Sequence, residues 1–241
     1  MYNGKVNNCT LYIVNCTLIG RVIQLVKDNL LKIRNDIGNA EVTIVATTKY
    51  FNEDKIIEAY EAGIRDFGES RVIEALDKIG KLPDEIRYSS RFHFIGHLQT
   101  NKVSKTVGNF DLIHSVDSLK LSQELSKAAL SAGIVQKILL QINNAAEGQK
   151  FGFGIEELFS AFAEIQKLEG IEIKGLMNIA PFGANKKELK RLFEEVVEVR
   201  NKLEKEFNCE LKEISMGMSD DYVEAISAGA TMIRIGRKLF I

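Results

Sequence analysis

Cysteine is scarce in this chain, and the few cysteines are poorly spaced for metal binding. The 241 residues contain three, Cys9, Cys16 and Cys209, and no Cys-x-x-Cys pair. Without that spacing or a nearby histidine the cysteines offer no zinc site. His93 and His97 are four residues apart, but the extended geometry of a strand would keep their side chains apart, and no HExxH pattern accompanies them. We therefore expect no metal, and free thiols in a reducing, cytoplasmic compartment.

Neither sign of charge is in excess. Lysine and arginine together number 32 against 33 aspartates and glutamates, the formal net charge is −1, and no basic run is longer than two residues. A surface for nucleic acid or for an anionic membrane needs clustered cations. The composition therefore excludes both partners and favours a small molecule.

Long apolar runs are also missing. The stretch TLYIVNCTLIG near the N-terminus is apolar for about one strand's length, but it has no charged start and no Ala-x-Ala site. It is also shorter than the ~20 residues that span a bilayer. We expect neither a signal peptide nor an anchor. We interpret residues 1–17 as an N-terminal extension, which is either ordered or an upstream stretch included by a misplaced start codon.

Only two prolines occur, and no linker rich in glycine, serine or proline divides the chain. Residues 18–241 are therefore expected to form one domain. Apolar residues from Ile19 to Ile37 recur at helical spacing. Eight strand-like segments, separated by helix-like ones, follow at 42–48, 64–70, 91–96, 112–117, 136–143, 172–180, 210–219 and 231–240. Since no GxGxxG follows the first strand, this alternation predicts an α/β fold of the closed (β/α)8 barrel (TIM barrel) type with an extra N-terminal helix.

Two glycine-bearing turns, SMGMSDD and RIGR, follow the seventh and eighth expected strands. In a (β/α)8 barrel a phosphate commonly binds at these two loops, where backbone N–H groups and a cation can meet. We therefore predict a phosphate site at Ser219, Gly236 and Arg237. The alternative for Ser219 is that it only caps a helix beginning at Asp220.

Two further cations lie at strand ends. Side chains alternate along TMIRIG, so Arg234 points into the barrel mouth if Ile233 and Ile235 pack outward. A buried arginine needs an acceptor, which is either a ligand or a neighbouring acid. Lys49 ends the first strand and is either solvated or, between apolar walls and near another cation, a neutral amine that can bond to an aldehyde. An amine, an arginine and a phosphate site around a ring-sized gap predict pyridoxal 5′-phosphate.

Longer motifs from about residue 20 onward resemble the pyridoxal phosphate homeostasis proteins, whose fold is related to the barrel domain of alanine racemase. The motifs, in the family's order, are FGES, HFIGHLQTNK, HSVDS, QINNAAEGQKFGF, GLMNIAPF and SMGMSDDYVEAISAGATMIRIG. The resemblance implies that Lys49 carries the cofactor as an internal aldimine (a Schiff base) and that Arg234 faces the pyridine nitrogen. It also implies that Ser219, Gly236 and the backbone at Arg237 hold the phosphate. Because arginine does not readily give up a proton, the ring would remain a weak electron sink.

Three positions depart from the family's pattern. ATTKYF stands where the family often has VSKTKP, Ser70 replaces the asparagine of FGEN, and Arg237 replaces a hydroxyl residue. The first departure puts in doubt a second, relay lysine, and the second puts in doubt a cofactor contact from the loop after strand two. At Arg237 we expect a backbone or guanidinium contact to the phosphate.

The resemblance implies a carrier that takes part in intracellular pyridoxal phosphate homeostasis, with apoenzymes and free amino acids as further partners. The alternative is a pyridoxal-dependent amino-acid racemase, which needs acid and base groups on both faces of the ring. In the racemase-like architecture an additional β domain supplies the second base, and this chain stops at Ile241. We therefore predict a monomer without turnover. A third possibility, a barrel enzyme acting on a phosphosugar, predicts a colourless protein.

Overall fold

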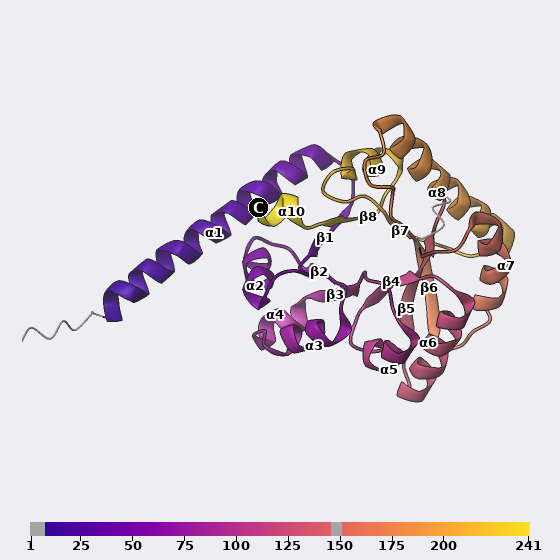
Figure 1. Ribbon diagram of the computed structural model, residues 1–241, viewed down its shortest axis with the longest axis horizontal. Coiled ribbons are helices and arrows are strands. Elements are labelled where there is room, and N and C mark those ends of the chain that lie inside the picture. Colours follow the sequence, from indigo (N-terminus) through magenta and orange to yellow (C-terminus); the bar gives the residue numbers. More distant parts are fainter. Residues whose placement is uncertain (1–7, 146–150) are drawn as a thin grey trace, which may run out of the picture.

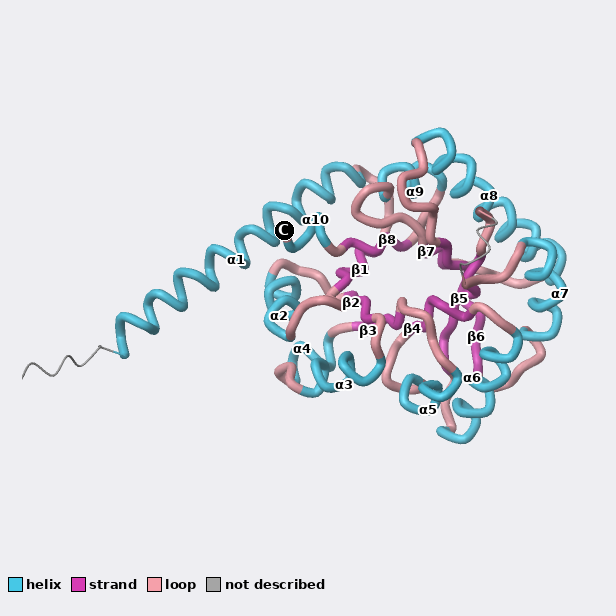
Figure 2. The backbone as a smooth tube through the Cα atoms, viewed as in Figure 1, coloured by secondary structure: helices cyan, strands magenta, loops and turns pink. Residues whose placement is uncertain are grey.

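The computed structural model describes residues 8–145 and 151–241, and within them eight strands close into one parallel barrel in chain order (Figure 1, Figure 2). The strands are β1 Thr43–Thr47, β2 Asp66–Glu69, β3 Arg91–Phe94, β4 Leu112–Val116, β5 Gln136–Ile142, β6 Ile171–Asn178, β7 Glu213–Ser215 and β8 Met232–Ile235. Since β8 pairs in parallel with β1, the sheet has no open edge. The predicted (β/α)8 barrel is confirmed.

Helices surround the strands on the outside of the barrel, as the cyan ring in Figure 2 shows. They are α1 Asn8–Ile37, α2 Glu53–Glu61, α3 Val72–Gly80, α4 Asp84–Ser89, the 3₁₀ turn η1 Thr100–Lys102, α5 Val103–Thr106, α6 Leu119–Ala132, α7 Ile155–Ile165, α8 Lys186–Phe207, α9 Tyr222–Ala228 and α10 Arg237–Phe240. Local sequence determines several helix ends. The Ser118 hydroxyl accepts from the Leu121 N–H at the start of α6, and Gly133 ends that helix with φ 67°.

Apolar side chains fill two separate spaces. The larger cluster lies between the strands and the helices and includes Phe67, Ile113 and Ile233, all fully buried. The smaller cluster consists of Leu112, Leu139, Met177 and Met232. Because side chains alternate along a strand, these four lie on the opposite face and fill the barrel interior. The barrel interior is therefore a packed core and not an open channel.

The N-terminal helix begins earlier than its apolar spacing indicates. It starts at Asn8 rather than near residue 19, so residues 8–17 of the expected extension are helical, and residues 1–7 lie outside the described part. Its C-terminal half packs on α2 and α10 and buries Val26, Leu30 and Ile33. The other half extends away from the barrel (Figure 1). Across the two described ranges, no helix combines the length and the apolar character that crossing a membrane requires.

The last two strands are shorter than expected. The predicted strand 210–219 contains only Glu213–Ser215 in strand conformation. The predicted strand 231–240 ends at Ile235, and Arg237–Phe240 form α10 instead. The apolar pair Leu239 and Phe240 is buried from a helix rather than from a strand. The loop after β7 therefore begins after Ser215 and the turn after β8 begins after Ile235, both earlier in the sequence than predicted.

Candidate functional site

The register between β1 and β8 brings two of the predicted site segments to the same place. Val45 pairs with Arg234 and Ala46 with Ile235, so the paired residues share a face of the sheet. A Cβ built on Gly236 would lie 3.5 Å from Thr47, which confirms that the RIGR turn lies beside the end of β1. Lys49 follows two residues after Thr47. The structure thus places Lys49 and the turn at Gly236 at neighbouring strand ends of the barrel mouth.

The turn after β7 lies against the turn after β8. The Ser219 side-chain oxygen accepts a hydrogen bond of 3.4 Å from the Lys238 N–H, near the start of α10. The interpretation of Ser219 as a cap of a helix at Asp220 is wrong, because α9 begins at Tyr222 and its N-cap residue is Asp221. The Asp221 carboxylate accepts from the Met218 N–H at 2.5 Å, within the turn that precedes the helix. Ser219 therefore faces the second turn, as a shared phosphate site requires.

Arg237 directs its guanidinium toward solvent. Its Nη2 donates to the Asp220 carboxylate at 2.6 Å, and both side chains are more than two-thirds exposed. This surface ion pair links the two turns from outside. Of the two phosphate contacts expected at Arg237, the guanidinium is therefore already engaged by Asp220 in solvent.

Arg234 is buried in the barrel, with 4% of its surface exposed. Its Nη1 donates to the Ser215 hydroxyl at 2.7 Å and its Nη2 to the Asn178 carbonyl at 2.8 Å. Burial lowers the pKa of Arg234 to about 10, while the charge of Asp221 opposes the shift. The guanidinium of Arg234 therefore donates to two uncharged oxygens, and the acid Asp221 interacts with it only through its charge. Arg234 remains a cation at neutral pH.

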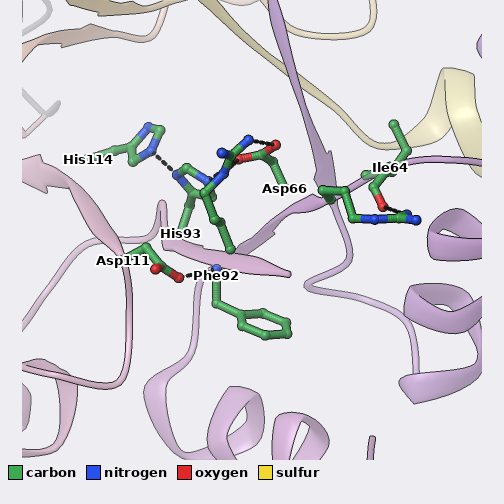
Figure 3. A network of polar contacts seen from close by, with 8 residues as sticks. Ile64, Asp66, Phe92, His93, Asp111 and His114 are labelled. Atoms are coloured by element: carbon green, nitrogen blue, oxygen red, sulfur yellow. Dashed lines mark hydrogen bonds and ion pairs between the residues drawn. The ribbon is translucent and has the colours of Figure 1, made fainter. Parts of the chain in front are cut away.

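A chain of hydrogen bonds continues from Ser215 through the barrel interior, and Figure 3 shows its far half. The Ser215 hydroxyl lies 2.9 Å from His114 Nδ1, His114 Nε2 lies 2.9 Å from His93 Nδ1, and His93 Nε2 lies 3.0 Å from Asp66. Arg91 closes the chain with two bonds of 2.6 Å to the Asp66 carboxylate. Polar residues of five strands are therefore connected across the core.

If both histidines are neutral, all the hydrogen bonds from Ser215 to Asp66 run in the same donor-to-acceptor direction. Burial, followed by the charges of His93 and Arg234, lowers the pKa of His114 well below its ordinary 6.5. Burial alone would raise the pKa of Asp66, but hydrogen bonds from His93 and Arg91 outweigh it and lower the pKa. A carboxylate at Asp66 requires an N–H on His93 Nε2, which makes Nδ1 an acceptor. His114 Nε2 then donates to His93 Nδ1, and His114 Nδ1 accepts from the Ser215 hydroxyl. Each donor in the network therefore has one acceptor.

Sequence reasoning missed this interior chain. His93 and His114 lie within motifs that were quoted for the family resemblance, and His93 was considered only as a metal ligand. The available signal was a polar residue alternating with apolar ones in RFHF and LIHSV, which places it inside the barrel. His97 is elsewhere, where its ring stacks on Phe151 and its Nδ1 lies 3.1 Å from Asp117. Within 8–145 and 151–241 no group of three or more His, Cys, Asp or Glu side chains is placed to hold a metal ion.

Lys49 itself is half-buried, and its ammonium lies 5.0 Å from the centroid of the Tyr50 ring. It lines a cavity of about 400 Å³ at the start of α2 and along α3, whose lining includes Arg71 and Lys78 but none of the predicted phosphate residues. The Lys49 amine therefore rests against Tyr50, and it is Thr47, two residues earlier, that lies beside the Gly236 turn. Ser70 lines a second cavity, of about 300 Å³, together with His97 and Lys102.

Comparison with known proteins identifies the family to which this chain belongs. Residues 23–241 match the family described as alanine racemase, N-terminal domain. Relatives named pyridoxal phosphate homeostasis protein include one from Synechocystis, 42% identical over 83% of this chain and 90% of its own length. Another, from Aquifex aeolicus, is 36% identical over 93% of this chain and 96% of its own length. The chain belongs to the pyridoxal phosphate homeostasis protein family.

Solved structures extend the comparison. PipY of Synechococcus elongatus, whose structure was solved with PLP bound, superposes with a TM-score of 0.81 at 35% identity, covering 90% of this chain and all of PipY. Alanine racemase of Clostridium difficile superposes with a TM-score of 0.73 at 17% identity, over 90% of this chain and 57% of its own length. The second likeness is one of fold alone.

Proposed function

We propose that this protein holds pyridoxal 5′-phosphate in the barrel mouth and acts as a carrier in intracellular homeostasis of that cofactor. Lys49 would bond covalently to the cofactor, and Arg234 would lie beside the pyridine nitrogen. Ser219, Gly236 and the backbone at Arg237 would hold the phosphate. When bound, the cofactor supplies an aldehyde, which a lysine amine converts to a carbon–nitrogen double bond with release of water.

One observation carries this proposal: the β1–β8 register puts Thr47, two residues before Lys49, beside the Gly236 turn, and the adjoining Lys238 N–H donates to Ser219. An amine and an anion site thus belong to adjacent strand ends. The family membership and the PLP-bound PipY structure support pyridoxal 5′-phosphate as the ligand. The lysine side chain can leave Tyr50 for the mouth by rotation about its own torsions, which costs little for an unpaired, flexible stem.

The residues around the site fit the cofactor. At Gly236 an added Cβ would meet only Thr47, at ordinary contact distance, so no protein atom demands a glycine there. The space beside it suits a ligand that approaches the backbone closely. The Asn178 side-chain oxygen is buried without a protein partner, although its carbonyl binds Arg234. A bound ring with polar substituents, or water, would supply the donor that this oxygen lacks.

The chemistry of Arg234 favours a carrier over a racemase. With a pKa of about 10 it stays protonated, so it donates a hydrogen bond to a ring nitrogen and does not transfer its proton. A ring nitrogen without a proton withdraws electrons weakly, which disfavours carbanion chemistry at a bound amino acid. We further propose that the protein works in the cytoplasm as a monomer, and that apoenzymes and free amino acids are its partners.

Reduction with borohydride tests the proposal. The protein mixed with pyridoxal 5′-phosphate should become yellow, and peptide mapping after reduction should locate one adduct on Lys49. Lys55, whose amine is paired with Glu58 at 2.5 Å, is the matched control, so Lys55→Ala should keep the colour and Lys49→Ala should lose it. A preparation that stays colourless, or an adduct on Lys55 or Lys102, contradicts the site. Sustained racemisation of alanine or serine would contradict the carrier role.

A further inference from the structure

A buried ion pair lies directly behind the residue that precedes Lys49. Glu69, at the end of β2, and Lys78, on α3, have side chains that are 2% and 8% exposed, and their charged atoms are 2.7 Å apart. Thr48 is fully buried beside them. These three residues, Thr48, Glu69 and Lys78, are called the Thr48 clamp below. Nothing in the site described so far uses them.

Two contacts within the clamp, and a third to the backbone of β2, converge on Thr48. The Lys78 ammonium donates to the Thr48 carbonyl at 2.9 Å, and the Thr48 hydroxyl donates to the Glu69 carboxylate at 2.6 Å. The Thr48 N–H also donates to the Gly68 carbonyl at 3.1 Å, beyond the last residue of β1. Both polar groups of the Thr48 backbone and its side chain are therefore held by β2 and α3.

Holding the Thr48 carbonyl also holds Lys49. The peptide bond between them is planar, so the position of that oxygen fixes the plane that contains the nitrogen and Cα of Lys49. Lys49 and Lys78 also line the same cavity, so one member of the clamp forms part of the wall of the space beside the Lys49 side chain. The clamp thus limits where the lysine amine can reach.

A purely structural role explains the clamp less well. Removing two charges from water is expensive, and an apolar pair of similar volume often stabilises a fold as much or more. A buried ion pair is therefore informative where its hydrogen bonds do something that apolar groups cannot. Here the hydrogen bonds end on the residue adjacent to the predicted cofactor lysine. We infer that Glu69 and Lys78 are positioning residues for Lys49, an inference that rests on the proposed function.

The test replaces both charges together. A single Lys78→Met change would leave Glu69 charged and unpaired in the core and could unfold the protein. The double variant E69L/K78M keeps apolar volume and removes every side-chain contact of the clamp to the Thr48 backbone. Lys81→Met is the matched control, because Lys81 lies just beyond the same helix and its 2.7 Å pair with Asp77 is exposed.

Two probes separate amine placement from phosphate binding. Protein stripped of cofactor with hydroxylamine is mixed either with pyridoxal 5′-phosphate, to follow covalent attachment by absorbance and by mass after borohydride, or with pyridoxine 5′-phosphate, which has no aldehyde. In E69L/K78M we expect attachment at Lys49 to slow by about ten-fold or more, the effect of misplacing a reacting group. Its affinity for pyridoxine 5′-phosphate should remain as in the parent, and Lys81→Met should alter neither.

Attachment at the parental rate in a folded E69L/K78M overturns the inference. So does a matching fall in pyridoxine 5′-phosphate affinity, because it would show a general disturbance of the pocket. Failure of the parent protein to form any Lys49 adduct has a different meaning: it refutes the proposed function.

Discussion

Replacing His114 by leucine should break the hydrogen-bond chain of the barrel interior at its centre. The substitution keeps a side chain of similar bulk at a fully buried position. It removes the acceptor of the Ser215 hydroxyl and the donor to His93 Nδ1. Arg234 keeps both of its acceptors, although the hydroxyl of one of them, Ser215, loses its hydrogen bond to His114.

The size of the effect follows from the groups left without partners. A buried polar group that loses its partner costs about 1–3 kcal/mol, so the two orphaned groups predict a loss of about 2–6 kcal/mol in the free energy of unfolding. For a domain of this length each kcal/mol lowers Tm by about 2–4 °C. The variant should therefore melt roughly 5–20 °C below the parent at neutral pH.

The same variant should change the pH dependence of stability. The pKa of buried His114 is depressed below 6.5, so the unfolded chain binds a proton there more readily than the folded one. The stability that it contributes is fully present above pH ~6.5 and is lost as pH falls toward the depressed pKa, by up to about 1.4 kcal/mol per pH unit. In His114→Leu this contribution to the slope between pH 6.5 and 5 should vanish.

Urea unfolding at several pH values, followed by circular dichroism, measures both effects. His97→Leu is the control, because His97 is partly exposed, lies outside the interior hydrogen-bond chain, can keep its apolar contact with Phe151 and bonds one partly buried acid, Asp117. Its stability should change by less than about 1 kcal/mol. If His114→Leu matches the parent in stability and in the pH dependence of stability, the hydrogen bonds of the barrel interior are not formed as the structure describes.

Three further substitutions probe the mouth. Gly217→Ala should lower Tm measurably, because Gly217 has φ 88° and a Cβ would lie 2.6 Å from the Ala225 Cβ; an unchanged melting curve would contradict the tight turn. Arg237→Ala should leave Tm within about 2 °C and retain cofactor in dialysis, since its guanidinium pairs with Asp220 in solvent. Arg234→Met should release cofactor in dialysis while the far-ultraviolet spectrum is kept, and full retention would exclude the proposed ring contact.

The alternation of strand-like and helix-like segments was sufficient to predict the barrel. Side-chain alternation likewise placed Arg234 in the interior, and position at a strand end singled out Lys49. These predictions depend only on local periodicity and on the chirality of parallel β-α units, both of which any stretch of sequence carries by itself. The ends of β7 and β8 could not be predicted in this way, because burial of Leu239 and Phe240 is compatible with a strand or a helix.

Which buried groups form hydrogen bonds with one another was decided by the tertiary structure alone. His114 bonds Ser215 across 101 residues, and Lys78 reaches back 30 residues to the Thr48 carbonyl. Such contacts depend on the register of neighbouring strands and on the direction of each side chain in a packed interior, and neither is encoded in a local pattern. The sequence thus determined which residues stand at the mouth of the barrel, while closure of the sheet decided which buried groups hold them there.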